Sequence, residues 1–264
     1  MRQKYIRGFR LSLSTLACLA ALTFQGCGAP ANSSRLSSLS KDAQPKWAAL
    51  VFGGNASCHP FGNDASSPYG LSMYTQFDEV VRDLRSQYAA DVDYFLICHT
   101  VTGRIYYASS AAPKIVSEVA PERLAKKVTE FTQTHGVQRL HAVGHSHGGW
   151  WALKLALQLA DQIHFDRLVT IDPISRVTCR PPNIMGCLGA PRDISESEYQ
   201  QIAESVGKWS NYYQSRTPYL HSSAIPGASE NIELPIDHLK IDNSAEVWRQ
   251  IRESAIIAVK ERNI

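Results

Sequence analysis

The residues with the clearest capacity for chemistry are residues 144–148, whose sequence Gly-His-Ser-His-Gly fits the pattern G-x-S-x-G around Ser146. An apolar run at 140–143 leads directly into this pattern, and a strongly apolar stretch at 150–160 follows it. A serine at a sharp turn between a buried strand and a helix adopts a strained backbone, and glycines two residues to either side prevent collisions with both elements. An ordinary glycine-rich turn is the alternative, but the flanking runs favour Ser146 as an exposed nucleophile.

A carboxylate stands at a suitable distance along the chain. A serine hydroxyl is a poor nucleophile at neutral pH, so it needs a histidine to take its proton and a carboxylate to orient that histidine. Asp172 follows the apolar run 168–171 and precedes Pro173. A strand that ends there brings the carboxylate to the carboxyl edge of a sheet, where Ser146 also emerges. An aspartate before proline can also cap a turn, and Glu230 is the second candidate for the acid.

Two backbone N–H groups are needed to stabilise the oxyanion of a tetrahedral intermediate. The residue that follows the nucleophile, His147, is expected to supply one of them. The second is expected from the loop after the early apolar run 47–52, where Gly53 and Gly54 permit close approach of the backbone and Asn55 follows. We predict that the amide of Gly54 or Asn55 is this donor, the other interpretation being a plain Gly-Gly-Asn turn.

Short apolar runs alternate with helical patterns along the chain, which is typical of a mostly parallel sheet flanked by helices. Each predicted strand is short and apolar enough to be buried on both faces. Between 173 and about 219 the pattern weakens to loop and one helical piece, 196–213, and we interpret 174–218 as a cap or lid insertion. The predicted strands are 47–52, 94–98, 140–143 and 168–171, and the predicted helices are 77–88, 121–134, 150–160 and 244–262.

Together these residues and elements resemble the α/β-hydrolase superfamily, from about Trp47 to the C-terminus. In that superfamily the nucleophile precedes the acid, and the acid precedes the histidine. Among the later histidines, His164 precedes the acid-bearing strand and His221 falls in an apparent strand. His238 instead lies in a loop just before the closing helix, where the superfamily places its base. The resemblance therefore implies the catalytic triad Ser146, Asp172 and His238.

The resemblance also bears on the sheet and on the acid. Residues 170–173, Thr-Ile-Asp-Pro, resemble the acid-bearing strand end of pancreatic-type lipases, which use the strand immediately after the nucleophile helix. Most members of the superfamily use a later strand, near which Glu230 lies. The chain has little room before Trp47 for the usual opening antiparallel strands, so a sheet of about six strands is expected. The superfamily implies acyl transfer to water, on substrates that range from esters and lipids to thioesters and peptides.

The histidines around the nucleophile allow a second interpretation. His145 and His147 flank the serine, and with His99 and His141 they are candidates for a metal cluster. Variable positions on either side of the serine explain the flanking histidines without a metal. We therefore expect neither a metal nor a cofactor.

Residues 1–26 are typical of an export signal, because four basic residues within the first ten precede a mainly apolar run at 11–24. That run is short and interrupted by hydroxyl residues, which argues against a membrane span. Residues 24–27, Phe-Gln-Gly-Cys, resemble the lipobox of bacterial lipoproteins and imply lipidation of Cys27, with ordinary cleavage nearby as the alternative. Residues 27–46, rich in Ser, Ala and Asn, are interpreted as a lipidated N-terminus and flexible tether, and 47–264 as the folded domain.

The net charge of +3 originates in the export segment, since removing its four basic residues leaves 23 basic and 24 acidic residues. A nearly neutral domain lacks the basic stripe that binding to phosphate backbones requires, so nucleic acid is excluded as a partner. The expected partners are a small-molecule or lipid ester and a membrane reached through the N-terminal anchor.

Four cysteines lie beyond the N-terminal segment. In an oxidising compartment Cys179 and Cys187 could close a small loop rich in proline and glycine. Cys58 and Cys98 each follow a strand-like run and could form a second bridge or remain buried thiols. Spacing alone does not fix the pairing.

The sequence thus predicts an exported serine hydrolase that cleaves carboxylic esters, as an esterase or lipase, through an acyl-enzyme on Ser146. Its predicted location is the bacterial cell envelope, as a lipoprotein facing the periplasm or the cell surface, or otherwise the medium as a secreted protein. The alternatives are a peptidase, amidase or thioesterase of the same fold, and a noncatalytic surface lipoprotein.

Overall fold

The structure, a computed structural model, describes residues 46–54, 57, 71–88, 92–100, 104–110, 112–175, 193–217 and 220–260. The chain divides into two units, Met1–Ala43 and Gln44–Ile264, and every described residue belongs to the second. The predicted export signal, the lipidation site Cys27 and the Cys179–Cys187 pair therefore lie outside the described residues.

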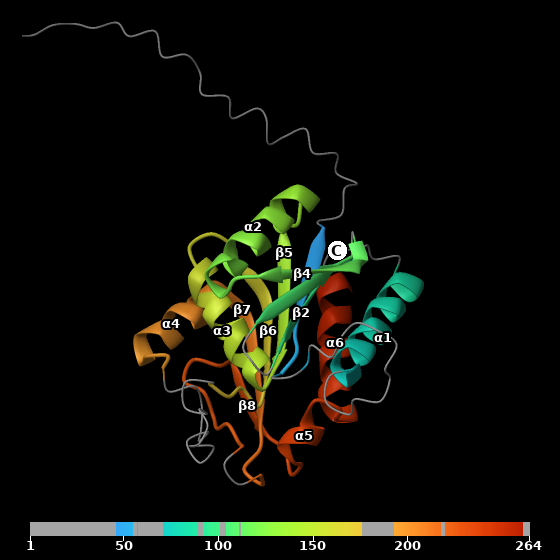
Figure 1. The fold of residues 1–264 in the computed structure, drawn as a ribbon. Coiled ribbons are helices and arrows are strands. Elements are labelled where there is room, and N and C mark those ends of the chain that lie inside the picture. The colour runs from blue at the N-terminus through green and yellow to red at the C-terminus, as the bar shows by residue number, and fades with distance from the viewer. Residues whose placement is uncertain are drawn as a thin grey trace, which may run out of the picture. The chain divides into compact units, whose positions relative to one another are not determined.

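An eight-stranded sheet forms the centre of this unit, in the order β4-β3-β2-β1-β5-β6-β7-β8 (Figure 1). The strands from β2 to β8 in this order run parallel to one another, whereas β3 and β4 add an antiparallel edge. The strands are β1 (Trp47–Phe52), β2 (Val92–His99), β3 (Ile105–Ser109), β4 (Ala112–Val119), β5 (Arg139–His145), β6 (Phe165–Ile171), β7 (Val206–Tyr213) and β8 (Glu230–Glu233).

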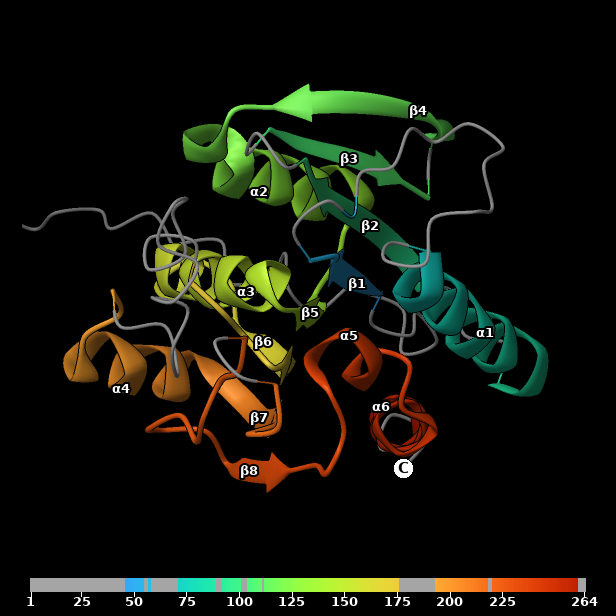
Figure 2. The same ribbon diagram turned by 60° about the horizontal axis from the view of Figure 1, so that its bottom comes forward.

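Helices cover both faces of the sheet, and alternate residues of each buried strand serve the two faces. In β1, for example, Leu50 and Phe52 pack with α2, α3 and α4, while Val51 packs with α1 and α6 on the opposite face (Figure 2). Burial of each such side chain contributes about 1.5–3 kcal/mol, which explains why the strand is apolar throughout. The helices are α1 (Leu71–Tyr88), the 3-10 turn η2 (Pro121–Arg123), α2 (Leu124–His135), α3 (His147–Leu159), α4 (Glu196–Ser205), α5 (His238–Ile241) and α6 (Ala245–Lys260).

The prediction of a mostly parallel sheet flanked by helices is confirmed, and the four predicted strands correspond to β1, β2, β5 and β6. The expected number of about six strands is wrong, because the sheet has eight. The prediction of fewer strands assumed that antiparallel strands would have to precede Trp47. In the structure the antiparallel strands instead lie within residues 105–119, after β2. The strands that were missed lie toward the edges, where one face or the other is solvated and the apolar signal is weak, as in the alternating exposure of β8.

The predicted helix 196–213 is also wrong in its second half. A capping box at Ser195 starts α4, but the helix ends at Ser205 and the following residues form β7, parallel to β6. A Cβ at Gly207 would lie 2.9 Å from the carbonyl oxygen of Asp166, so glycine allows this close strand pairing. The predicted cap at 174–218 therefore includes a strand of the central sheet, and 176–192 lies outside the described residues.

Two further observations concern the helices and the cysteines. None of the helices in the described ranges combines the length and the hydropathy needed to cross a membrane. Cys98, near the end of β2, is fully buried, and every other cysteine of the chain lies outside the described residues.

Candidate active site

Ser146 occupies a strained turn between β5 and α3, with φ 54° and ψ −126°. A Cβ on Gly144 would lie 2.5 Å from the carbonyl oxygen of Gly148, and one on Gly148 would lie 2.4 Å from two carbonyl oxygens of the β1 end. Backbone atoms cannot move aside as flexible side chains do, so both positions require glycine. We call residues 144–148 the nucleophile elbow. Its geometry matches the strand-turn-helix expected from the sequence.

The elbow is tied to the end of the neighbouring strand β6. The Ser146 N–H donates to the carbonyl of Ile171 at 2.9 Å, and the Ile174 N–H donates back to the carbonyl of Ser146 at 3.1 Å. Asp172 lies between these two contacts with φ 45°, in the left-handed region. The Asp172 N–H in turn donates to the carbonyl of Tyr212, at the end of β7, at 2.6 Å. The ends of three parallel strands thus fix the serine and the carboxylate together.

His238 joins these two side chains. Its Nδ1 lies 2.7 Å from Asp172 Oδ2 and its Nε2 lies 2.9 Å from Ser146 Oγ. A carboxylate can only accept, so Nδ1 carries the imidazole proton and Nε2 presents a lone pair to the serine hydroxyl. Asp172 is completely buried and His238 nearly so. The structure therefore brings the three predicted triad residues into one continuous hydrogen-bonded chain.

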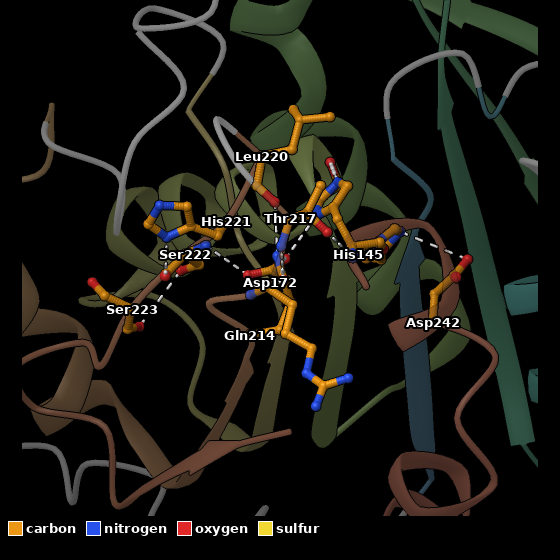
Figure 3. Close-up of polar contacts among 12 residues, drawn as sticks. His145, Asp172, Gln214, Thr217, Leu220, His221, Ser222, Ser223 and Asp242 are labelled. Atoms are coloured by element: carbon orange, nitrogen blue, oxygen red, sulfur yellow. Dashed lines mark hydrogen bonds and ion pairs between the residues drawn. The ribbon is translucent and has the colours of Figure 1, made fainter. Parts of the chain in front are cut away.

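The Asp172 carboxylate accepts two further hydrogen bonds, drawn in Figure 3. The Ser222 N–H donates to Oδ1 at 2.6 Å, and the Gln214 amide donates from Nε2 to Oδ2 at 2.7 Å. Both donors come from residues 214–217 and 220–222, which follow β7 and which we call the acid loop. Three donors in all hold the carboxylate, as a buried charge requires.

The acid loop also contacts His238. The Thr217 hydroxyl oxygen accepts a hydrogen bond of 2.8 Å from the N–H of His238, the first residue of α5. Neither Gln214 nor Thr217 was predicted from the sequence. Gln214 directly follows β7, just as Asp172 directly follows the neighbouring strand β6. Without the register of β7 against β6, a glutamine at this position cannot be distinguished from a surface residue.

The loop after β1 lies against Ser146. A Cβ on Gly54 would come within 3.2 Å of Ser146 Cβ, so glycine lets this backbone approach the serine. Two contacts fix the preceding residue, Gly53: its N–H donates to the Ile97 carbonyl at 2.9 Å, and its carbonyl accepts from Nδ1 of the buried His99 at 3.1 Å. The other predicted loop donor, Asn55, lies outside the described residues, and His147 is the first residue of α3.

His145 lies beside the triad without being part of it. Its Nε2–H donates to the backbone carbonyl of His238 at 3.2 Å, and its ring lies 5.0 Å from the His238 ring. Its Nδ1 points toward Asp242, 3.7 Å away (Figure 3). Burial lowers the pKa of His145 to about 3, with a smaller contribution from repulsion by His238, so the ring is neutral at physiological pH.

The other histidines do not form a metal cluster with it. Among the described residues no group of three or more His, Cys, Asp or Glu side chains could hold a metal ion. The His147 ring stacks on Trp150 and accepts a hydrogen bond from Trp151 at 3.2 Å. His141 lies on β5 beside Asp166, and burial lowers its pKa.

The remaining candidates lie away from Ser146. Glu230 stands on the edge strand β8 in an ion pair with Lys208, and its pKa is lowered chiefly by the hydrogen bond with that lysine. Its contacts do not include His238, so the structure does not bring the runner-up acid to the base. His164 precedes β6, at the opposite end of the strand from Asp172, and the Nδ1 of His221 lies 3.1 Å from the Ser222 carbonyl.

No protein-family profile and no curated protein matches the chain. Solved structures resemble it distantly. A gene product of Listeria innocua has a TM-score of 0.45 at 14% identity, covering 78% of this chain and 92% of its own. A CIB-like hydrolase of Thermoplasma acidophilum scores 0.43 at 16% identity, with 84% and 89% covered. A meta-cleavage product hydrolase of Pseudomonas fluorescens scores 0.44 at 11% identity, with 81% and 92% covered.

Proposed function

We propose that the protein is a serine hydrolase in which Ser146 is the nucleophile, His238 the general base and Asp172 the acid that orients it. The observation that carries the proposal is the hydrogen-bonded chain from Ser146 Oγ through His238 to Asp172, at 2.9 and 2.7 Å. These distances are within the reach needed for proton transfer. A noncatalytic protein has no need to maintain a strained serine, a histidine and a buried aspartate in this hydrogen-bonded order.

In the proposed reaction the Ser146 hydroxyl gives its proton to His238 Nε2 while Oγ attacks the carbonyl carbon of the substrate. The resulting oxyanion is stabilised by backbone N–H groups, for which His147 and either Gly54 or Asn55 are our candidates. The protonated His238 then gives its proton to the leaving oxygen, and the alcohol departs from an acyl-enzyme. Water, activated by the same histidine, hydrolyses the acyl-enzyme and restores the serine.

For the substrate we propose a carboxylic ester of a small molecule or a lipid, with no cofactor. The same machinery would cleave thioesters or amides, so the nature of the leaving group, an alcohol, a thiol or an amine, has to be tested directly. We propose comparing p-nitrophenyl esters of short and long acyl chains with thioester and anilide analogues of the same acids. Faster hydrolysis of the oxygen esters is expected, and a preference for anilides would instead identify an amidase or peptidase.

The mechanism is tested with a fluorophosphonate probe, which labels activated serines covalently. Labelling is expected for the wild-type protein and should disappear in Ser146→Ala, with Ser205→Ala as the control for a buried serine that lies outside the site and hydrogen-bonds only within α4. Absence of labelling in the folded wild-type protein would sink the proposal and favour a noncatalytic surface lipoprotein.

We also propose that the enzyme is exported and anchored to a bacterial membrane through a lipidated Cys27. The export-signal pattern of residues 1–26 and the lipobox-like residues 24–27 support this. Incorporation of labelled palmitate in a bacterial host is expected for the full-length chain and not for Cys27→Ser. Equal incorporation in both would contradict lipidation at Cys27.

A further inference from the structure

Gln214 is a fully buried polar side chain that donates a hydrogen bond to the acid of the proposed triad. We propose that Gln214 is a positioning residue that fixes Asp172 and His238 relative to each other through the acid loop. The inference rests on the proposed function, because it concerns the efficiency of the same triad.

All the hydrogen-bonding capacity of the Gln214 amide is used. Its Nε2 donates to Asp172 Oδ2 and to the carbonyl of Leu220, both at 2.7 Å. Its Oε1 accepts from the N–H groups of Arg216 and Thr217, both at 2.8 Å. One side chain thus connects the carboxylate to both halves of the acid loop, and a buried amide with every group paired has little freedom to rotate.

The segment that Gln214 organises carries the other contacts of the triad. Thr217 donates its N–H to the side-chain oxygen Oε1 of Gln214, and its hydroxyl oxygen accepts from the His238 N–H at 2.8 Å. Ser222, two residues beyond Leu220, donates its N–H to Asp172 Oδ1. The orientation of the carboxylate and the start of α5 therefore depend on one conformation of the loop, and Gln214 is the side chain that joins them.

The chemistry of the amide explains why glutamine occupies this position. The side chain at this position must donate to a carboxylate and a carbonyl on one side and accept from two N–H groups on the other. A single uncharged group can do both only if it carries N–H and C=O, as an amide does. Leucine has nearly the same size but makes none of these bonds. Glutamate keeps the shape, but its second oxygen would face two acceptors unless it were protonated.

The test compares Gln214→Leu, Gln214→Glu and Thr217→Val with the wild type, using p-nitrophenyl ester hydrolysis measured as kcat and KM across pH. We expect Gln214→Leu to lose about 10- to 100-fold in kcat with little change in KM, because a buried bond to a charged group is lost without loss of substrate contacts. Thr217→Val should lose less, because it breaks only the link to His238. The control is Gln200→Leu, which changes an exposed glutamine of α4 that donates to Glu204, and it should leave kcat unchanged.

Gln214→Glu distinguishes a positioning role from a merely structural one, because only a positioning role should change the pH dependence of kcat. The new carboxyl would share a proton with Asp172, since two adjacent buried carboxylates cannot both ionise readily. At low pH this shared proton restores a donor toward Asp172, so part of the activity should return relative to Gln214→Leu. As pH rises and the proton is lost, kcat should fall over a range in which the wild type stays active. Equal pH profiles for the wild type and Gln214→Glu, or unchanged kcat in Gln214→Leu, would overturn the inference.

A second measurement keeps this test separate from the proposed function. The NMR resonance of the proton on His238 Nδ1 reports the contact with Asp172 whether or not any ester is hydrolysed. It should be sharp and far downfield in the wild type and in Gln200→Leu, and broadened by exchange with water in Gln214→Leu. A wild type without hydrolytic activity would refute the proposed function alone, whereas an unaltered resonance in Gln214→Leu would refute the positioning role of Gln214.

Discussion

The nucleophile elbow and the acid loop both hold one partner of the proposed triad, but they do so by different physical means. The elbow fixes Ser146 by close backbone packing, in which Gly144 and Gly148 contact carbonyl groups that no side chain could displace. The acid loop fixes Asp172 by polar contacts, mainly from one amide side chain and one backbone N–H. The steric restriction selects glycine at a fixed spacing from Ser146, so it is visible in the local sequence. The hydrogen bonds depend on which segments, distant in the sequence, lie next to each other in the fold.

This difference predicts different consequences of mutation. Changes in the elbow should affect folding as well as chemistry, because the turn belongs to the packed contact between β1, β5 and α3. Changes in the acid loop and its carboxylate should affect the chemistry far more than the folding.

The largest effect is expected for Asp172→Asn. The carboxylate accepts from Ser222 on one oxygen and from Gln214 and His238 on the other, so an amide group would direct N–H toward a donor on one side. His238 would then favour the tautomer that carries its proton on Nε2, with no lone pair for the serine. We expect kcat for ester hydrolysis to fall by about 10⁴-fold, with a circular dichroism spectrum like that of the wild type. Activity within tenfold of the wild type would show that Asp172 is not the acid.

The second largest effect is expected for Gly148→Ala, and it concerns stability. The new Cβ would lie 2.4 Å from the carbonyl oxygens of Phe52 and Gly53, so the β1 end and the elbow would have to separate. We expect the free energy of unfolding in urea to fall by about 3 kcal/mol or more. The matched control is Gly136→Ala, where a Cβ meets nothing within 4 Å but φ is 64°, and a cost of about 1–2 kcal/mol is expected. Equal costs at the two positions would refute the steric account of the elbow.

The contrast also explains what could be predicted from the sequence. Ser146 and its elbow are local, since strand, turn and helix follow one another within a few residues and demand glycine at set positions. Asp172 and His238 could be located because a strand end and the loop before the last helix are recognisable from apolar patterning. The central strands β1, β5 and β6 were predictable for the same reason, because each contains a short, mainly apolar run.

Gln214, Thr217 and Ser222 could not be found in this way. Their importance depends on the parallel pairing of β7 with β6, and β7 carries polar residues such as Lys208 and Asn211 that obscure its pattern. Because 206–213 was assigned to a helix, the segment after it was assigned to a cap and not to the edge of the sheet. An error in one element thus concealed the residues that hold the acid.

A smaller effect, on the pH dependence of stability, is expected from His145 in the elbow. Its pKa falls from an ordinary value of 6.5 to about 3 on burial, so below pH 6.5 the unfolded chain binds a proton that the native protein does not. Stability contributed by this residue is therefore complete above pH 6.5 and is lost as pH falls, at about 1.4 kcal/mol per pH unit. Between pH 7 and pH 5 the unfolding free energy should drop by roughly 2 kcal/mol more in the wild type than in His145→Gln. Parallel pH profiles for the two proteins would show that His145 is not buried as a neutral ring.

The smallest effect is expected for Glu230→Gln, which tests a carboxylate outside both regions. Glu230, on the edge strand β8, pairs with Lys208 and Ser210 of β7, and the Glu230 and Lys208 side chains are each 39% exposed. Solvent screens such a pair, so its loss should cost at most about 1 kcal/mol of stability. Because neither the elbow nor the acid loop depends on Glu230, kcat and its pH profile should match those of the wild type. A large loss of kcat in Glu230→Gln, together with an active Asp172→Asn, would identify Glu230 on β8 as the acid. The acid loop would then hold no residue of the triad, and the contrast between the elbow and the acid loop would have no functional basis.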